Sequence, residues 1–347
     1  MHRTTNGIWI AISRLLAIVG LGSLLAASAA PAANAQTLPQ RDGETHGGVK
    51  TCAGGPCHGH ASPTRKKRVF LDEATIWRRD DLHARAYDVL RNERSVRIAK
   101  NLGLAEKAHE AKLCLDCHAD NVPANLRGKQ FRLDEGVGCE ACHGGSARWV
   151  KRHATGTPHA ENLELGMYPA DDPAKRAELC LSCHYGTKEK FVDHRLMGAG
   201  HPRQSFELHV FTQTQPAHFE MDADYAARGK RSAAGLEVWA IGQAVAARHV
   251  LDVLLDPQLS KEGIWPEFVL FDCHACHHAM SEERWRPRPS VALGPGLARL
   301  NDSSFLMLRH AMLLLAPERA EAFQRDTRAL LDVYAGGVRE RGIAQAA

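Results

Sequence analysis

The sequence predicts a mainly α fold with long loops and little β structure. Three segments carry apolar residues at helical spacing, whereas runs of alternating apolar and polar residues, typical of half-buried strands, are scarce. A third observation is the presence of 10 Cys and 20 His, many of them adjacent, in a chain of 347 residues. Because these residue types bind metals and cofactors, they indicate site chemistry before they indicate fold.

Each of the three predicted helices is an amphipathic or apolar segment with a glycine or proline signal. The segments are residues 72–103, 235–256 and 303–334. Gly103 stops the first helix and Pro257 ends the second. Pro317 is an expected break within the third, because proline removes a hydrogen bond from a helix interior.

The first 35 residues have the pattern of a secretory signal peptide. Arg3 and Arg14 give a basic start, residues 15–30 are apolar, and small residues predict cleavage after Ala35. The apolar run is short for a membrane-spanning helix, so membrane association is expected only if the signal stays uncleaved. No later segment is expected to cross a membrane. The mature chain is therefore expected in the periplasm.

Opposite charges nearly cancel in the mature chain. Removing Arg3 and Arg14 takes the 44 basic residues to 42 against 40 acidic ones, a formal charge of about +2. Near-neutrality and export both argue against nucleic acid as a partner. The run RKKR at residues 65–68 is interpreted as a solvated face, with a docking patch for an acidic redox protein as the alternative.

All ten cysteines fall into five pairs, and a histidine follows the second cysteine of every pair. Four pairs have the form C-x-x-C-H, and the first, CAGGPCH, has four residues between its cysteines. The five units are Cys52, Cys57 and His58; Cys114, Cys117 and His118; Cys139, Cys142 and His143; Cys180, Cys183 and His184; and Cys273, Cys276 and His277. At this composition C-x-x-C-H is expected about 0.02 times by chance. Coincidence is therefore excluded.

Covalent attachment of haem explains the repeated unit. Two thiols add to the vinyl groups of one porphyrin edge, and the adjacent histidine gives the iron its proximal nitrogen. Five disulfides would leave the histidines unexplained, and zinc would use two cysteine pairs per ion. The sequence predicts five haem c groups that form much of the core, with a Cys52–Cys57 disulfide as the alternative at the first unit.

Several stretches resemble the exported multihaem cytochromes c related to cytochrome c-554. They are Trp77 followed by LHARAY, then CLDCH, GVGCEACHGG, CLSCH, HRLMGAGHPRQSFEL and FDCHACHH. The family's best-known member carries four haems and passes electrons, and this chain departs from it by a fifth motif and a C-terminal extension. We expect a signal peptide at residues 1–35, a multihaem domain at 36–290 and a helical extension at 291–347.

The resemblance also implies distal ligands on the second face of each iron. It favours His83, six residues after the tryptophan, and His153, shortly after the third motif. His201 lies in a glycine-rich loop that lets the backbone approach a ring, with His194 as its alternative. His218 is a further candidate.

Two functions from different classes follow. The first is an electron carrier whose haems are mostly ligated by two histidines and which serves redox partner proteins. The second is an oxidoreductase that acts on a small nitrogen or sulfur compound at one haem with an open face. A subunit of a larger redox complex is a third possibility. The sequence favours the carrier, because no catalytic cluster stands out from the ligand histidines and no motif replaces its histidine by lysine.

Overall fold

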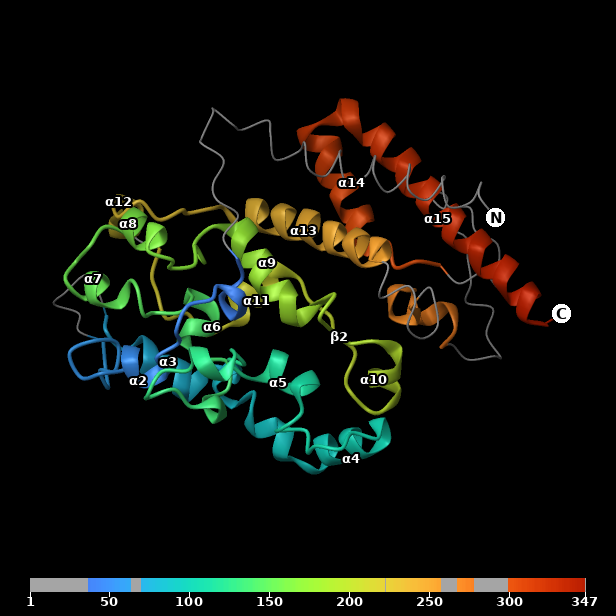
Figure 1. Ribbon diagram of the computed structural model, residues 1–347. Helices are drawn as coiled ribbons and strands as arrows, with labels where there is room; N and C mark the ends of the chain where they lie inside the picture. Colours follow the sequence, from blue (N-terminus) through green and yellow to red (C-terminus); the bar gives the residue numbers. More distant parts are fainter. Residues whose placement is uncertain (1–36, 64–69, 222, 257–266, 278–298, 347) are drawn as a thin grey trace. The chain divides into compact units, whose positions relative to one another are not determined.

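The computed structural model describes residues 37–63, 70–221, 223–256, 267–277 and 299–346. Four predicted features lie outside the described residues: the signal peptide at 1–35, the basic run at 65–68, Pro257 and the domain boundary near residue 290. The helices and their connections are shown in Figure 1.

Helices dominate the described chain, which confirms the predicted mainly α class. The α-helices are α2 Val49–Cys52, α3 Glu73–Asp80, α4 Glu93–Leu102, α5 Lys112–His118, α6 Cys139–His143, α7 Val150–Ala154, α8 His159–Glu164, α9 Pro173–His184, α10 His194–Gly198, α11 Leu208–Thr214, α12 Ala223–Ala227, α13 Gly235–Leu255, α14 Ser303–Leu315 and α15 Pro317–Ala346. The 3₁₀ helices are η2 Pro39–Arg41, η3 Leu82–Arg85, η4 Asp88–Arg91, η5 Ala124–Leu126, η6 Leu133–Glu135, η7 Phe268–Leu270 and η8 Cys273–Ala275. Strands β1 Gly186–Thr187 and β2 Lys190–Phe191 form an antiparallel pair.

The chain divides into two compact units. Of the described residues, the larger unit contains those from 37 to 191 and from 195 to 242, and it holds the first four cysteine pairs. The smaller unit contains residues 192–194 and the described residues after 242, and it holds the fifth pair. Each unit has its own apolar core.

The larger unit has a small apolar cluster beside its second motif. Tyr87 precedes η4, Leu90 lies in η4 and Ala99 lies in α4, and they pack with Leu115 and Ala119 at α5. Because burial of apolar area stabilises a fixed arrangement, this cluster holds the second motif against the preceding helical segment.

The smaller unit is built on a helical hairpin of α14 and α15 (Figure 1). The rings of Phe305 and Phe323 stack across the hairpin with centroids 6.4 Å apart, and both are fully buried. Pro317 is the first residue of α15, and Ala316 before it leaves the helical conformation. The predicted break at Pro317 is therefore confirmed.

The single helix predicted over residues 72–103 is wrong, although its end at Gly103 is confirmed. The segment is divided into α3, η3, η4 and α4, and Asp81 and Asn92 at two of the breaks are in extended conformation. The Asp81 side chain accepts the His83 amide, and the Asn92 side chain accepts the Ser95 amide. Both side chains cap a new helical turn, so each restarts the helix where a continuous one was expected.

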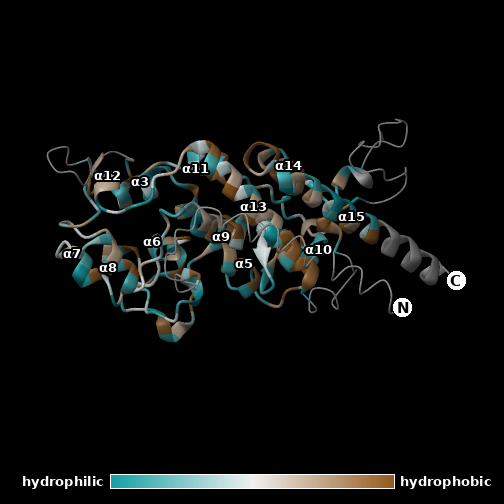
Figure 2. Ribbon diagram, turned by 90° about the horizontal axis from the view of Figure 1, so that it is seen from above, coloured by the Kyte–Doolittle hydropathy of each residue, from teal (hydrophilic) through white to brown (hydrophobic). Residues whose placement is uncertain are grey.

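Helix α13 confirms the helix predicted over residues 235–256. It is predominantly apolar, as is α14 (Figure 2). Among the described helices α13 is the one long and apolar enough to cross a membrane by length and composition, which corrects the expectation that no later segment would be. Core helices pass the same test, and Ala247, Leu251 and Leu254 are buried within the smaller unit.

Candidate functional site

Three of the cysteine motifs lie on helices that end at the motif histidine. Helices α5, α6 and α9 end at His118, His143 and His184. Residues three apart in a helix share one face, so both thiols of each motif point the same way. We number the sites in chain order: site one (Cys52, Cys57, His58), site two (Cys114, Cys117, His118), site three (Cys139, Cys142, His143), site four (Cys180, Cys183, His184) and site five (Cys273, Cys276, His277).

Site one, with its wider spacing, keeps the backbone connection of a regular motif. The amide of His58 donates to the carbonyl of Cys52 at 3.0 Å, and the amide of His277 donates to that of Cys273 at 2.7 Å. The extra residues of site one fold into a turn closed by the Cys57 amide and the Gly54 carbonyl. All ten cysteines are free thiols. The AGGP loop therefore bulges out while the histidine keeps its place.

Each motif histidine faces one histidine from elsewhere in the chain. The pairs, with ring centroid separations, are His58 and His153 (6.0 Å), His118 and His201 (6.4 Å), His143 and His218 (6.2 Å), His184 and His83 (6.1 Å), and His277 and His194 (6.2 Å). Four pairs lie within the larger unit, and the His194–His277 pair lies within the smaller one.

These separations fit one iron between two imidazoles. Metal–imidazole bonds are about 2.0 Å long, and the bonded nitrogen lies roughly 1.1 Å from the centroid of its five-membered ring, given the lengths of the ring bonds. Two rings on opposite sides of one iron should therefore have centroids about 6.2 Å apart. The observed range of 6.0–6.4 Å matches this value at all five sites.

Hydrogen bonds fix the free nitrogen of several paired rings. The Nδ1 atom of His58 lies 2.8 Å from a Glu73 carboxylate oxygen, and that of His83 lies 2.9 Å from an Asp81 oxygen. Nδ1 of His118 lies 2.9 Å from the Ala86 carbonyl, and Nδ1 of His201 lies 2.8 Å from the Pro202 carbonyl. An acceptor at Nδ1 holds the proton there and leaves Nε2 free as the metal ligand.

Burial also favours the neutral, metal-binding form of several rings. It lowers the pKa of His143 to about 3, and it lowers the pKa of His153, His184 and His218 as well. His83 differs, because its hydrogen bond to Asp81 raises its pKa. A neutral imidazole keeps the lone pair that coordinates iron, so the donor set suits haem iron.

The structure thus gives each predicted distal histidine a specific partner. His83 faces site four, His201 faces site two, and His153 faces site one, although it follows the third motif in the chain. His218 faces site three and His194 faces site five; the sequence offered the first as a further candidate and the second as the alternative to His201. The sequence signal for these two residues was the count of motifs, since five proximal histidines require five distal partners.

Thiols from different sites lie beside one another in the larger unit. The Cys52 thiol is within hydrogen-bonding reach of Cys139, and this contact, with burial, raises the pKa of Cys52. Cys117 makes the same kind of contact with Cys183. Burial raises the pKa of Cys142, and Cys180 and Cys183 are near enough to raise it further. Sites one and three, three and four, and four and two are therefore neighbours.

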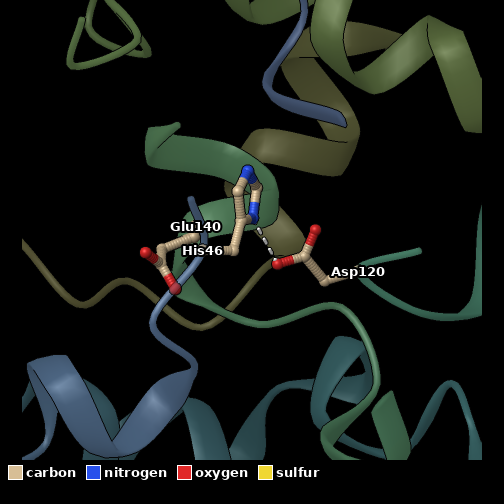
Figure 3. Close-up of side chains that lie close together, drawn as sticks. All are labelled: His46, Asp120 and Glu140. Atoms are coloured by element: carbon tan, nitrogen blue, oxygen red, sulfur yellow. Dashed lines mark hydrogen bonds and ion pairs between the residues drawn. The ribbon is translucent and has the colours of Figure 1, made fainter. Parts of the chain in front are cut away.

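A buried polar cluster joins the segments around the second and third motifs (Figure 3). The cluster consists of His46, Asp120 and Glu140, whose oxygen and nitrogen atoms are close enough to hold a metal ion. Nδ1 of His46 lies 2.7 Å from an Asp120 oxygen, and Nε2 lies 3.8 Å from Asp42. The imidazolium of His46 therefore lies between the carboxylates of Asp120 and Asp42, and these three residues form a structural clamp.

The clamp predicts a loss of stability at high pH. Burial opposes the charge of His46, yet the hydrogen bond to Asp120 and the nearby Asp42 carboxylate raise its pKa from 6.5 to about 10. The folded state therefore binds the proton more tightly than the unfolded chain. This stabilisation is fully present below pH 6.5 and is lost as the pH rises through 10, by several kcal/mol in the free energy of unfolding.

Denaturant unfolding followed by circular dichroism at pH values from 6 to 10.5 measures this effect. We expect stability to fall with pH in the unmodified chain and to fall much less in the His46→Gln variant. Equal pH dependence in the two proteins would show that His46 is not the titrating group.

Comparison with known proteins finds one family. Residues 51–144 match the family model described as cytochrome c554 and c-prime, which confirms the predicted resemblance over this segment. The matched residues include sites one, two and three together with His83. No curated protein and no solved structure matches the chain.

Proposed function

We propose, from the premise that the chain is a c-type cytochrome similar to cytochrome c554, that it carries electrons through five haem c groups, each ligated by two histidines. The observation that carries this proposal is the pairing of all five motif histidines with a second imidazole at the separation an iron requires. Haem iron bound in this way exchanges one electron between its ferric and ferrous states.

The ligand assignment follows from the pairs. The motif histidine of each site is the proximal ligand, and the distal ligands are His153 at site one, His201 at site two, His218 at site three, His83 at site four and His194 at site five. His194 is further oriented by the Phe268 ring, 5.4 Å away, and by its amide, which donates to Glu267 at 2.8 Å.

The thiol contacts support an order for the sites in the larger unit. Cys52 and Cys139 join sites one and three, Cys142 lies near the cysteines of site four, and Cys183 and Cys117 join sites four and two. Because each sulfur is bonded to a porphyrin edge in the mature protein, neighbouring sulfurs bring those edges together. The proposed path runs through sites one, three, four and two.

The pairing also favours a carrier over an enzyme. An enzyme acting on a small nitrogen or sulfur compound would keep one iron face open, and each of the five motif histidines in the described chain faces a second imidazole. The N-terminal signal pattern and the chemistry of haem attachment support export to the periplasm. Redox proteins there are the proposed partners.

Intact mass spectrometry counts the haems, and we expect five per mature chain. In Cys52→Ala, which removes one thioether bond from site one, we expect incomplete attachment and a protein with four haems. Cys114→Ala is the matched variant at a regular motif and should also lose one. Five haems in Cys52→Ala combined with four in Cys114→Ala would make the Cys52–Cys57 pair structural.

A further inference from the structure

Lys190 on β2 is a lysine whose charged end is buried between two haem sites. The residue is 6% exposed. Its Nζ donates to the Gln40 side-chain oxygen at 2.7 Å, to the Asp116 carbonyl at 2.9 Å and to the sulfur of Cys183 at 3.0 Å. An ammonium group has three N–H donors, so these three acceptors satisfy all of them.

Gln40 and Asp116 offer neutral oxygens, and the sulfur of Cys183 is also neutral once it is bonded to a porphyrin, as the proposed function has it. As a free thiol, Cys183 has a pKa well below its usual value because of its contact with Cys117 and the charge of Lys190. Asp116 offers Lys190 its backbone carbonyl, while its carboxylate binds Lys112 and the Asn121 amide. Nζ of Lys190 donates to these three acceptors in the described part of the chain, and none of the three is a carboxylate. The positive charge of Lys190 is therefore not cancelled by direct contact with an acid.

The contact with sulfur places this charge at the junction of two sites. Cys183 belongs to site four, and its sulfur is in reach of Cys117 from site two. Both sulfurs are bonded to porphyrin edges in the proposed function, on which this inference rests. A fixed positive charge in a low-dielectric interior attracts an added electron more strongly than it would in water.

We propose that Lys190 raises the reduction potentials of sites four and two above those of sites one and three. Lys190 thereby makes the pair of sites four and two the electron-accepting end of the path in the larger unit. Each transfer from site three to site four moves one electron, which oxidises one iron and reduces the other, and no proton or group moves with it.

Potentiometric titration followed by visible absorption tests the role of Lys190. In Lys190→Met we expect two of the five haem transitions to move to lower potential. At each of the two, the equilibrium constant for reduction should fall at least tenfold, which corresponds to 59 mV for one electron. Lys188→Met is the matched control, because Lys188 lies in the turn of the same hairpin with its side chain 62% exposed. We expect it to change each constant less than twofold.

Gln40→Glu provides a second test that keeps the lysine. It places a carboxylate on the ammonium group with little change in shape, so it should lower the potentials of the same two transitions. Lys190→Arg, which retains the charge, should stay within threefold of the unmodified protein. Unchanged potentials in Gln40→Glu, or equal shifts in Lys188→Met and Lys190→Met, would overturn the proposal.

The outcome separates this inference from the proposed function. A protein with five low-spin haems and potentials insensitive to Lys190 and Gln40 would overturn the role of Lys190 alone. Fewer than five haems, or an open iron in the unmodified protein, would overturn the proposed function whatever the potentials show.

Discussion

Replacing His83 by alanine is expected to open site four without loss of haem. The ring of His83 faces His184 at 6.1 Å, and the 2.9 Å contact of its Nδ1 with Asp81 holds it in place. Alanine removes the imidazole from this face of the iron, whereas the thioether bonds and His184 are unchanged. The reduced variant should bind one carbon monoxide per chain, and the unmodified protein should bind none. The potential of site four should rise because a nitrogen donor is lost.

Visible and electron paramagnetic resonance spectra measure the change of spin state in His83→Ala. His109→Ala is the matched control, because His109 packs against the ring of Tyr87 and not against a motif histidine. We expect the control to remain low-spin and to bind no carbon monoxide. A His83→Ala variant with the spectrum and ligand binding of the unmodified protein would remove His83 from the ligand set.

Replacing Glu140 by leucine is expected to cause the largest loss of stability. Glu140 is 2% exposed and lies between the two cysteines of site three. Its carboxylate points away from the imidazole of His46 (Figure 3) and accepts the amides of Gly47, Gly48 and Ser146 at 2.7–2.8 Å. Leucine leaves these donors without their acceptor, which should lower the free energy of unfolding by about 3–5 kcal/mol.

Guanidinium unfolding followed by circular dichroism gives the loss in Glu140→Leu directly. Glu161→Gln is the matched control, because Glu161 forms an exposed pair with Arg152 at 3.4 Å. Its removal should cost less than about 1 kcal/mol. Similar losses in the two variants would show that the backbone donors around Glu140 find other partners.

The sequence predicted the proximal half of each site, because cysteine and histidine spacing is local and repeats. The distal half depends on how distant segments fold together. His153 follows His143 by ten residues but faces His58, and no local pattern carries that information. From the sequence, His194 is the alternative to His201 and His218 is a further candidate, since no local pattern pairs either residue with its motif.

The helices show the same division between local and distant information. Helical periodicity over residues 72–103 is present, but Asp81 and Asn92 interrupt it with side-chain caps. Both residue types are recognised N-caps, so the breaks were visible in principle. The charge between sites two and four was not visible, because Lys190, Gln40 and Cys183 meet only in the folded chain.

Electron paramagnetic resonance of the fully oxidised, unmodified protein tests the central claim most directly. Five irons, each held between two imidazoles, should give low-spin signals that integrate to five spins per chain, after allowance for coupling between neighbouring sites. Added nitrite, hydroxylamine or sulfite should leave these signals unchanged. A high-spin signal approaching one spin per chain that shifts with any of these compounds would contradict the account and identify one haem as an open, substrate-binding site.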